Sequence, residues 1–273
     1  MYIDSHAHLF VEDYGTELPD VIRRAQDAGV ERIVVPGTNE RTSKEALELA
    51  EKYEFIYACV GLHPHEAAKA TDALLAEIES FTTYRKVVGI GEIGLDYHYD
   101  FSPREQQIAV FRQQIELAIR TQLPIVVHTR ESYPDTVQVI DECLAKWPQW
   151  KNGRRTGDTA IASARGVFHC FTGSAAEASH LFERGFYVSY PGIVTFKNST
   201  AVETLKHIGF ENILLETDSP YLAPVPLRGT RNEPAHVALI ARKISEILEV
   251  SESNVATVTS LNSKNLFRLE SPD

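Results

Sequence analysis

The chain has 273 residues, of which 43% are apolar and 24% are charged, a composition typical of globular proteins and not of disordered ones. The formal net charge of −11 argues weakly against a nucleic-acid partner, because phosphate binding usually requires a basic surface, although cations bound at carboxylates would offset this charge. No apolar run approaches the ~20 residues of a membrane-spanning helix, and no basic segment followed by an apolar one marks a secretory signal, so we expect no membrane association.

Short apolar runs alternate with helical patterns along the chain. The runs predict strands at Tyr2–Ser5, Arg32–Pro36, Ile56–Val60, Val87–Ile90, Pro124–His128, Gly166–His169, Tyr187–Ser189 and Ile213–Glu216. Apolar residues recur at helical spacing between them, for example over Arg104–Thr121. Ser102, followed by proline and by a glutamate three residues on, predicts the N-cap of that helix, and Thr71 and Ser251 predict further caps.

The repeated strand-helix pattern predicts an α/β fold. Eight such repeats with continuously apolar strands favour a closed parallel (β/α)8 TIM barrel with the helices outside, and an open doubly wound sheet is the alternative. No linker composition interrupts the chain, so residues 1–273 are expected to form one domain. The basic, non-periodic stretch Trp147–Arg165 predicts a long loop, either simply solvated or in contact with phosphate.

Side chains that can bind metal ions follow six of the eight predicted strands. His6 and His8 end the first strand, and their spacing places both on one face of it. The groups at the other strand ends are His63, His65, Glu92, Asp96, His128, His169, Glu216 and Asp218. A lone His-x-His pair would more often belong to a polar terminal tail, and a single strand-end histidine is most often structural. The strand ends of a barrel meet at its active site, however, so the whole set predicts a metal centre.

The mixture of imidazoles and carboxylates favours zinc, manganese, iron or cobalt over magnesium, which prefers more oxygen ligands. The set is too large for one tetrahedral ion. Glu92, preceded by glycines that allow close approach, is the best candidate for a carboxylate that bridges two ions. A two-metal centre clamps the attacking and leaving oxygens of an in-line displacement, so the pattern predicts a hydrolase.

The motifs HAH (6–8), GLHPH (61–65), GEIGLDY (91–97), HTR (128–130), HCFTG (169–173), ETDSPYL (216–222) and RNEP (231–234) make the chain similar to the TatD family of metal-dependent hydrolases. The resemblance extends from Met1 to about Phe267, with the motifs in the family's order. It implies a TIM-barrel fold and, because several members are metal-dependent DNases, a deoxyribonuclease activity. The segment of residues 151–164 is longer than the corresponding segment in the family pattern. This difference leaves the metal ligands intact but puts the substrate preference in doubt.

The resemblance also implies the roles of individual residues. One metal ion would have the ligands His6, His8, Glu92 and Asp218, and the second would have Glu92, His128 and His169, with Glu92 shared. The cofactors are therefore expected to be two divalent ions, Mg²⁺, Mn²⁺ or Zn²⁺. As a mechanism we expect two metal ions to activate a water molecule as a hydroxide, with Asp218 accepting the proton that the water loses and orienting the hydroxide. His63 matches a histidine that approaches the substrate phosphate, where it would stabilise the developing charge.

Basic and aromatic side chains near the strand ends are candidates for substrate contact. The basic ones, for which surface ion pairs or solvation are the alternatives, are Arg130, Lys197, Arg228 and Arg231. The aromatic ones, which would stack on bases if they do not simply pack in the protein, are Tyr97, Tyr99, Phe171 and Tyr221.

The preferred function is a divalent-metal phosphodiesterase that acts on DNA from a single-stranded end as a 3′–5′ exonuclease, a polarity that comes from the family alone. An amidohydrolase or lactonase that uses the same dinuclear site on a small molecule is the alternative, and a non-catalytic binding protein is a third reading. We expect a monomer without an obligate protein partner. The three cysteines form no Cys-x-x-Cys pair, which predicts reduced thiols and a cytoplasmic location. The sequence leaves the physiological metal and the choice between DNA and RNA open.

Overall fold

The computed structural model describes residues 1–150 and 164–269, which form two compact units. Unit 1 comprises the described residues 1–35 and 169–269, and unit 2 comprises the described residues 36–150 and 164–168. Most of the predicted basic loop lies in residues 151–163, outside the described part of the chain. The assignment of residues 1–273 to one domain stays a prediction.

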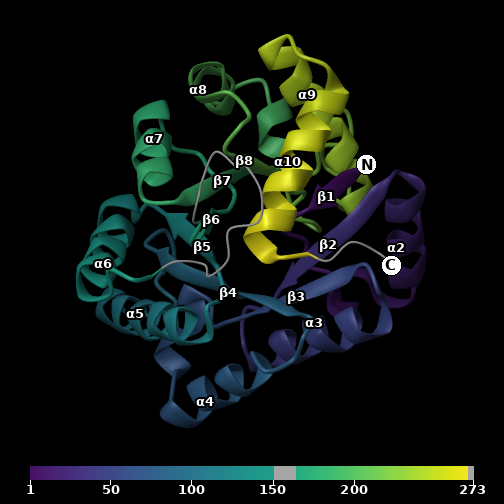
Figure 1. The fold of residues 1–273 in the computed structure, drawn as a ribbon. Coiled ribbons are helices and arrows are strands. Elements are labelled where there is room, and N and C mark those ends of the chain that lie inside the picture. The colour runs from purple at the N-terminus through teal and green to yellow at the C-terminus, as the bar shows by residue number, and fades with distance from the viewer. Residues whose placement is uncertain (151–163, 270–273) are drawn as a thin grey trace. The chain divides into compact units, whose positions relative to one another are not determined.

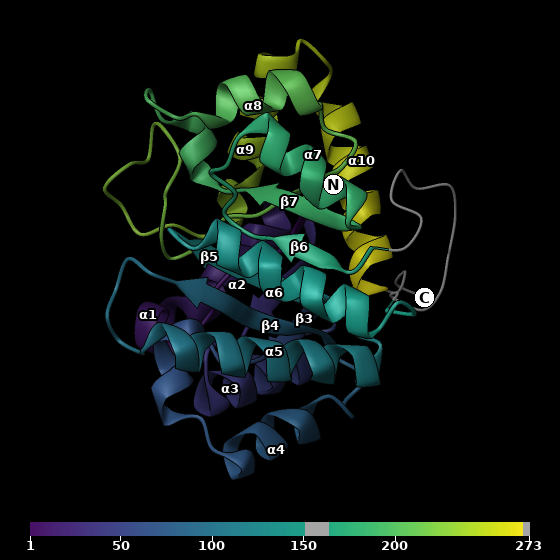
Figure 2. The same ribbon diagram turned by 90° about the vertical axis from the view of Figure 1, so that its left-hand side faces the viewer.

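Unit 2 contains four successive strands with the helices that connect them. The strands are β3 (Ile56–Val60), β4 (Val87–Asp96), β5 (Ile125–Arg130) and β6 (Gly166–Phe168), each paired in parallel with the next. The helices are α3 (Glu40–Lys52), the 3₁₀ helix η2 (Pro64–Lys69), α4 (Asp72–Phe81), α5 (Arg104–Thr121) and α6 (Tyr133–Lys146). In Figures 1 and 2, α5 lies along β4, with which it makes extensive contacts.

Unit 1 contains the first and last strands. They are β1 (Tyr2–Asp4), β2 (Val30–Pro36, whose final residue begins unit 2), β7 (Phe186–Tyr190) and β8 (Ile213–Leu215). The helices are α1 (Val11–Tyr14), η1 (Gly15–Glu17), α2 (Leu18–Asp27), α7 (Ala175–Glu183), η3 (Gly192–Thr195), α8 (Ala201–Ile208), η4 (Pro234–His236), α9 (Val237–Leu248) and α10 (Glu252–Phe267). The long helix α10 packs on β1 and β8 (Figure 1).

The eight strands follow one another in the sheet in sequence order, from β1 to β8. Within unit 1, the Ser5 N–H also donates to the Leu215 carbonyl at 2.9 Å, so the chain just after β1 is bonded to β8. A doubly wound sheet would reverse its order at a switch point. The predicted (β/α)8 TIM barrel is therefore confirmed and the open-sheet alternative is wrong.

The predicted helix Arg104–Thr121 is confirmed residue for residue as α5, but its predicted cap is wrong. Pro103 occupies the N-cap position, while the Ser102 hydroxyl accepts from the Ala68 N–H at 2.9 Å and donates to the His65 carbonyl at 2.8 Å. This hydroxyl therefore stabilises η2 and not α5. The caps at Thr71 and Ser251 are confirmed, since each side chain accepts a backbone N–H of the first helical turn.

Strand β4 is longer than predicted, ending at Asp96 and not at Ile90. Three residues of β4 span the interval that two residues of β5 span between Ile125 and Val127, so β4 contains a bulge at Gly91–Glu92. A Cβ on Gly91 would lie 2.6 Å from that of Val126, which explains the glycine next to the candidate ligand. The strand resumes pairing beyond the bulge and carries Asp96 to its end.

All three cysteines are free thiols, with Cys59 and Cys143 in the core. Among residues 1–150 and 164–269, no helix is both long and apolar enough to cross a bilayer.

Candidate metal centre

Four ligand-type side chains gather in unit 1, and we call His6, His8, His169 and Asp218 the β1–β8 cluster. The Nε2 atoms of His6 and His8 lie 3.1 Å apart, so the two rings converge as their spacing predicts. The Asp218 Oδ1 atom lies 3.7 Å from both. The His169 ring stacks on that of His6 at 4.0 Å between centroids. All four residues are at least nine-tenths buried.

Backbone pairing between the chain after β1 and the chain after β8 positions this cluster. The Asp218 N–H donates to the His6 carbonyl at 2.9 Å, and the His8 N–H donates to the Ser219 carbonyl at 2.7 Å. Asp218 itself has φ +54°, a left-handed conformation that aspartate tolerates better than most residues. Two segments from opposite ends of the sequence therefore present their ligands side by side.

Two buried carboxyl groups support the cluster: Asp4, which was not predicted as a site residue, and Glu216, which was predicted only as one of the strand-end groups. Asp4 accepts the Thr217 N–H at 2.9 Å and the Thr217 hydroxyl at 2.5 Å, and burial raises its pKa to about 7. Glu216 accepts the Cys170 N–H and the Ser189 hydroxyl, each at 2.6 Å, and burial raises its pKa to about 8. The sequence does contain a signal for Asp4, because Asp4, His6 and His8 occur at every second position and therefore lie on one face of an extended chain.

The RNEP motif braces the segment that carries Asp218. The buried Asn232 side chain donates to the Thr217 carbonyl at 2.9 Å and to the Tyr221 carbonyl at 2.6 Å. Arg231 instead contacts α1 and η1: its guanidinium pairs with Glu17 and lies 4.7 Å from the Tyr14 ring. A substrate contact by Arg231 stays a prediction, and the partners observed here are structural.

Unit 2 holds a second group, the β4 cluster, made of His63, His65, Glu92, Asp96 and His128. The Glu92 Oε1 atom lies 2.8 Å from His128 Nδ1 and 3.5 Å from His63 Nε2. The Asp96 Oδ2 atom lies 3.0 Å from Nε2 of both His128 and His65. Individual roles were predicted from the sequence for three of these five residues, His63, Glu92 and His128.

Asp96 and His65 were predicted as strand-end groups able to bind metal, but their role in supporting His128 was not predicted. Burial acts to raise the pKa of Asp96, but the hydrogen bonds with His128 and His65 outweigh it and hold that pKa well below the usual range. An ionised Asp96 accepts the Nε2–H of His128, which leaves Nδ1 of that ring directed at Glu92. The signal was again strand periodicity, because Glu92 and Asp96 are separated by an even number of residues in one strand.

His63 has the geometry of a hydrogen-bond donor. Its Nδ1 accepts the His65 N–H at 3.2 Å, so in the neutral ring the proton resides on Nε2, the atom that faces Glu92. Burial and the neighbouring His128 lower the pKa of His63 to about 4, so the ring is neutral at pH 7. Its Nε2–H is then available to an oxygen atom in the site.

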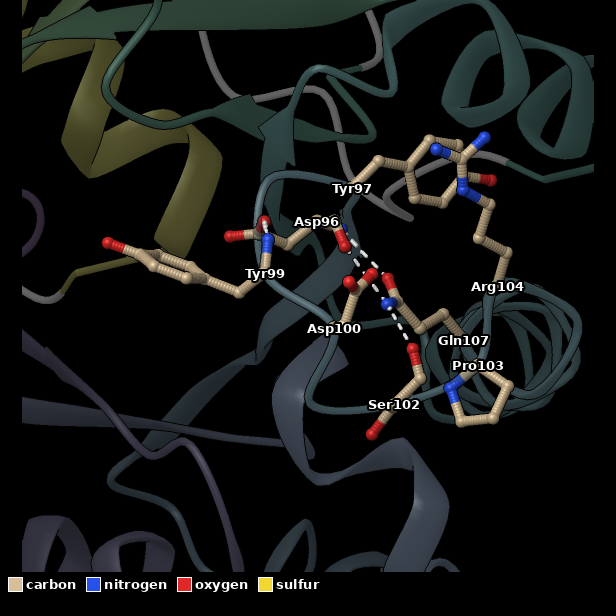
Figure 3. A pocket seen from close by; sticks show the side chains of 8 residues that line it. All are labelled: Asp96, Tyr97, Tyr99, Asp100, Ser102, Pro103, Arg104 and Gln107. Carbon is tan, nitrogen blue, oxygen red and sulfur yellow. Dashed lines mark hydrogen bonds between the residues drawn. The ribbon is translucent and has the colours of Figure 1, made fainter.

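Helix α5 fixes both loops of the β4 cluster through two buried glutamines. The Gln114 amide accepts the Leu62 N–H and donates to the Leu62 carbonyl, at 2.7 and 2.9 Å. The Gln107 amide makes the same pair of bonds with Asp96, at 2.8 and 2.9 Å (Figure 3). Each glutamine amide therefore makes the pair of hydrogen bonds that the backbone of a neighbouring strand would otherwise make.

The donor atoms of both clusters fit divalent cations. Ligands of one ion with bonds of ~2.0–2.2 Å lie roughly 3–3.5 Å from one another. The separations of 3.1 and 3.7 Å in the β1–β8 cluster and of 2.8 Å between His128 and Glu92 in the β4 cluster are near this range. Ligand atoms of His6, His169 and Asp218, and those of His63, Glu92 and His128, each fall within 4.8 Å of one another. The structure thus groups His169 with His6 and Asp218, and Glu92 with His128.

The remaining predicted substrate residues lie on loops at strand ends. Arg130 is exposed, with its guanidinium 4.9 Å from the Tyr99 ring. Lys197 and Arg228 line one pocket of about 350 Å³ in unit 1, where the Arg228 guanidinium covers the Phe196 ring at 4.0 Å. Of the aromatic candidates, Phe171 is buried and so unavailable to a base, whereas Tyr221 is exposed beside His8.

Comparison with known proteins assigns the family. Residues 3–268 match the family model described as TatD related DNase. The chain is 43% identical over 270 residues to the uncharacterized metal-dependent hydrolase YabD of Bacillus subtilis (strain 168), covering 98% of this chain and 100% of YabD. It is 32% identical over 270 residues to the 3'-5' ssDNA/RNA exonuclease TatD of Shigella flexneri serotype 5b, covering 97% and 98%. The crystal structure of YJJV, a TatD homolog from Escherichia coli K12, superposes with a TM-score of 0.85 at 29% identity, covering 98% of each chain. The chain therefore belongs to the TatD family of metal-dependent hydrolases, as its motifs predicted.

Proposed function

We propose that this protein hydrolyses phosphodiester bonds of DNA, as a 3′–5′ exonuclease that works from a single-stranded end. The observation that carries the proposal is the gathering of buried imidazoles and carboxylates at strand ends in two clusters with metal-ligand spacing. A relative of 32% identity is named as a 3'-5' ssDNA/RNA exonuclease, which supports a single-stranded nucleic acid as the substrate. The monomeric state and the cytoplasmic location stay predictions.

We assign the cofactor as two divalent ions, with the ligands His6, His8, Glu92, His128, His169 and Asp218. Such ions lower the pKa of water and offset the negative charge on phosphoryl oxygens. The sharing of Glu92 between them, which the resemblance implies, is part of the proposal.

The chain's own groups supply the remaining steps. Asp218 orients the attacking water and accepts its proton, since its carboxylate lies beside both histidines of the first strand. The neutral His63 donates its Nε2–H to a phosphoryl oxygen, where the hydrogen bond strengthens as negative charge develops.

The proposal is tested with metal-free protein and end-labelled single- and double-stranded DNA, to which Mg²⁺, Mn²⁺ or Zn²⁺ is added in turn. We expect a ladder that shortens from the 3′ end of single strands and requires metal. Absence of cleavage with every metal, together with hydrolysis of esters or lactones, would replace the proposal by the small-molecule alternative. RNA run in parallel decides between the two nucleic acids.

A second test addresses how Asp96 supports His128. We expect Asp96→Asn to weaken divalent-metal binding by about 10–100-fold, because an amide oxygen carries no negative charge to hold the Nε2–H tautomers of His65 and His128. Competition with a chromophoric chelator measures the affinity. The exposed neighbour Asp100, changed to Asn, is the matched control and should retain the parent affinity. Parent-like binding by the Asp96 variant would show that Asp96 does not act through the metal ligand.

A further inference from the structure

The loop between β4 and α5 carries two large exposed rings next to each other. Tyr99 is 41% exposed and Phe101 is 62% exposed, and their ring centroids lie 5.3 Å apart at an interplanar angle of 31°. Exposed aromatic rings of this size leave apolar area in water, and adjacent ones mark a surface that a ligand covers more often than isolated ones do. The exposure of these two adjacent rings therefore points to a ligand-binding surface.

The neighbouring Tyr97, in contrast, has its hydroxyl and one face of its ring in contact with other residues of the protein. Its hydroxyl donates to Asp135 at 2.7 Å, and the Arg104 guanidinium covers its face at 4.1 Å. Figure 3 shows Tyr97 turned toward Arg104 and Tyr99 extending to the other side of the loop. Tyr97 thus belongs to the packing of unit 2, and Tyr99 does not share that role.

The two exposed rings adjoin the β4 cluster. The His65 ring meets both edge-on, at 5.5 Å from Tyr99 and 4.7 Å from Phe101. His65 is in turn hydrogen-bonded to Asp96, which contacts the candidate metal ligand His128. One histidine therefore separates the exposed rings from the residues proposed to perform the chemistry.

A positive charge accompanies the rings. Arg130, at the end of β5, places its guanidinium 4.9 Å from the Tyr99 ring and remains exposed. The residues described around it include no carboxylate in an ion pair with Arg130. Aromatic rings and a cation beside them are the elements with which proteins bind single strands, the rings on bases and the cation on the backbone.

We propose that Tyr99 and Phe101 form a stacking platform for a nucleobase of single-stranded nucleic acid, with Arg130 bound to an adjacent phosphate. The inference rests on the proposed function and names the feature of the substrate that the site recognises. Both faces of a base inside a duplex are covered by its neighbours, so the platform selects unpaired nucleotides. Stacking needs no hydrogen bond to a base edge, so the platform accepts any of the four bases.

The test compares the double variant Tyr99→Ala/Phe101→Ala with the parent on three substrates: single-stranded DNA, double-stranded DNA, and an abasic strand of the same length. Loss of stacking is expected to raise KM for single-stranded DNA about 5- to 150-fold and to leave kcat within twofold. KM for the abasic strand should not change, because it has no base to stack. Tyr84→Ala, which removes a 50% exposed ring just before β4, is the control and should behave as the parent.

Two further measurements distinguish a failure of the stacking platform from a failure of the proposed reaction. The variant Tyr99→Phe/Phe101→Tyr keeps both rings and should restore the parent KM. Anisotropy of a labelled oligonucleotide without added metal reports binding independently of cleavage. If the parent cleaves no DNA but its binding of single strands weakens in the alanine variant, the platform stands and the proposed reaction is wrong. If the alanine variant binds and cleaves single strands as the parent does, the platform is wrong and the proposed reaction stands.

Discussion

Asp218→Asn is expected to reduce turnover of DNA by about 10²–10⁴-fold while the protein remains folded. Asparagine keeps an oxygen at the Oδ1 position and tolerates the left-handed backbone observed at φ +54°, so the geometry should survive. What disappears is the negative charge beside His6 and His8 and the ability to accept a proton.

Initial rates on end-labelled DNA at saturating metal measure this loss, and circular dichroism confirms the fold. Asp27→Asn is the matched control, because Asp27 is an exposed carboxylate of unit 1 whose ion pair among the described residues is with Arg23, on the surface of α2. Cleavage at the parent rate by the Asp218 variant would remove this residue from the mechanism.

Gly94→Ala is expected to cost about 3–5 kcal/mol of unfolding free energy, which corresponds to a Tm lower by roughly 6–20 °C. Gly94 has φ +143°, a conformation that residues with a Cβ rarely adopt. An added Cβ would lie 2.0 Å from the His128 carbonyl oxygen, which is held in the β4–β5 ladder. Both strands would have to separate where they carry Glu92 and His128.

The control for this substitution is Gly229→Ala. Gly229 has φ +87° and no heavy atom within 4 Å of an added Cβ, so it isolates the backbone cost of about 1–2 kcal/mol. Thermal unfolding followed by circular dichroism compares the two. Equal losses in both variants would mean that β4 and β5 adjust to the added methyl without strain.

The features that the sequence predicted correctly depend on short-range patterns. Each strand was located by its apolar run, and α5 was predicted to the residue because its apolar spacing is confined to one helix. Histidines and carboxylates at strand ends are rare enough to be recognised as candidate ligands without knowing their partners, and their binding of metal stays a prediction.

The features that were missed depend on partners distant in sequence. Ser102 has a proline and a glutamate placed as in a helix start, yet its hydroxyl bonds with η2, more than thirty residues earlier. Asp4 holds Thr217, which is 213 residues away. Asp96 acquires its role only when His65 and His128 arrive from two other elements. No local pattern contains these pairings.

The two glutamines of α5 bear on how substrate preference can change in this protein. Gln107 and Gln114 are seven residues apart, two turns of one helix, so they fix Asp96 and Leu62 to a common rigid support. Each must donate and accept at once, which glutamate or leucine cannot do. The loop beyond Asp96 is therefore anchored at its base while its tip, with Tyr99 and Phe101, stays exposed. Substitutions at the tip can alter which strand is bound without displacing the histidines beneath, so selectivity and chemistry can evolve separately on the same scaffold.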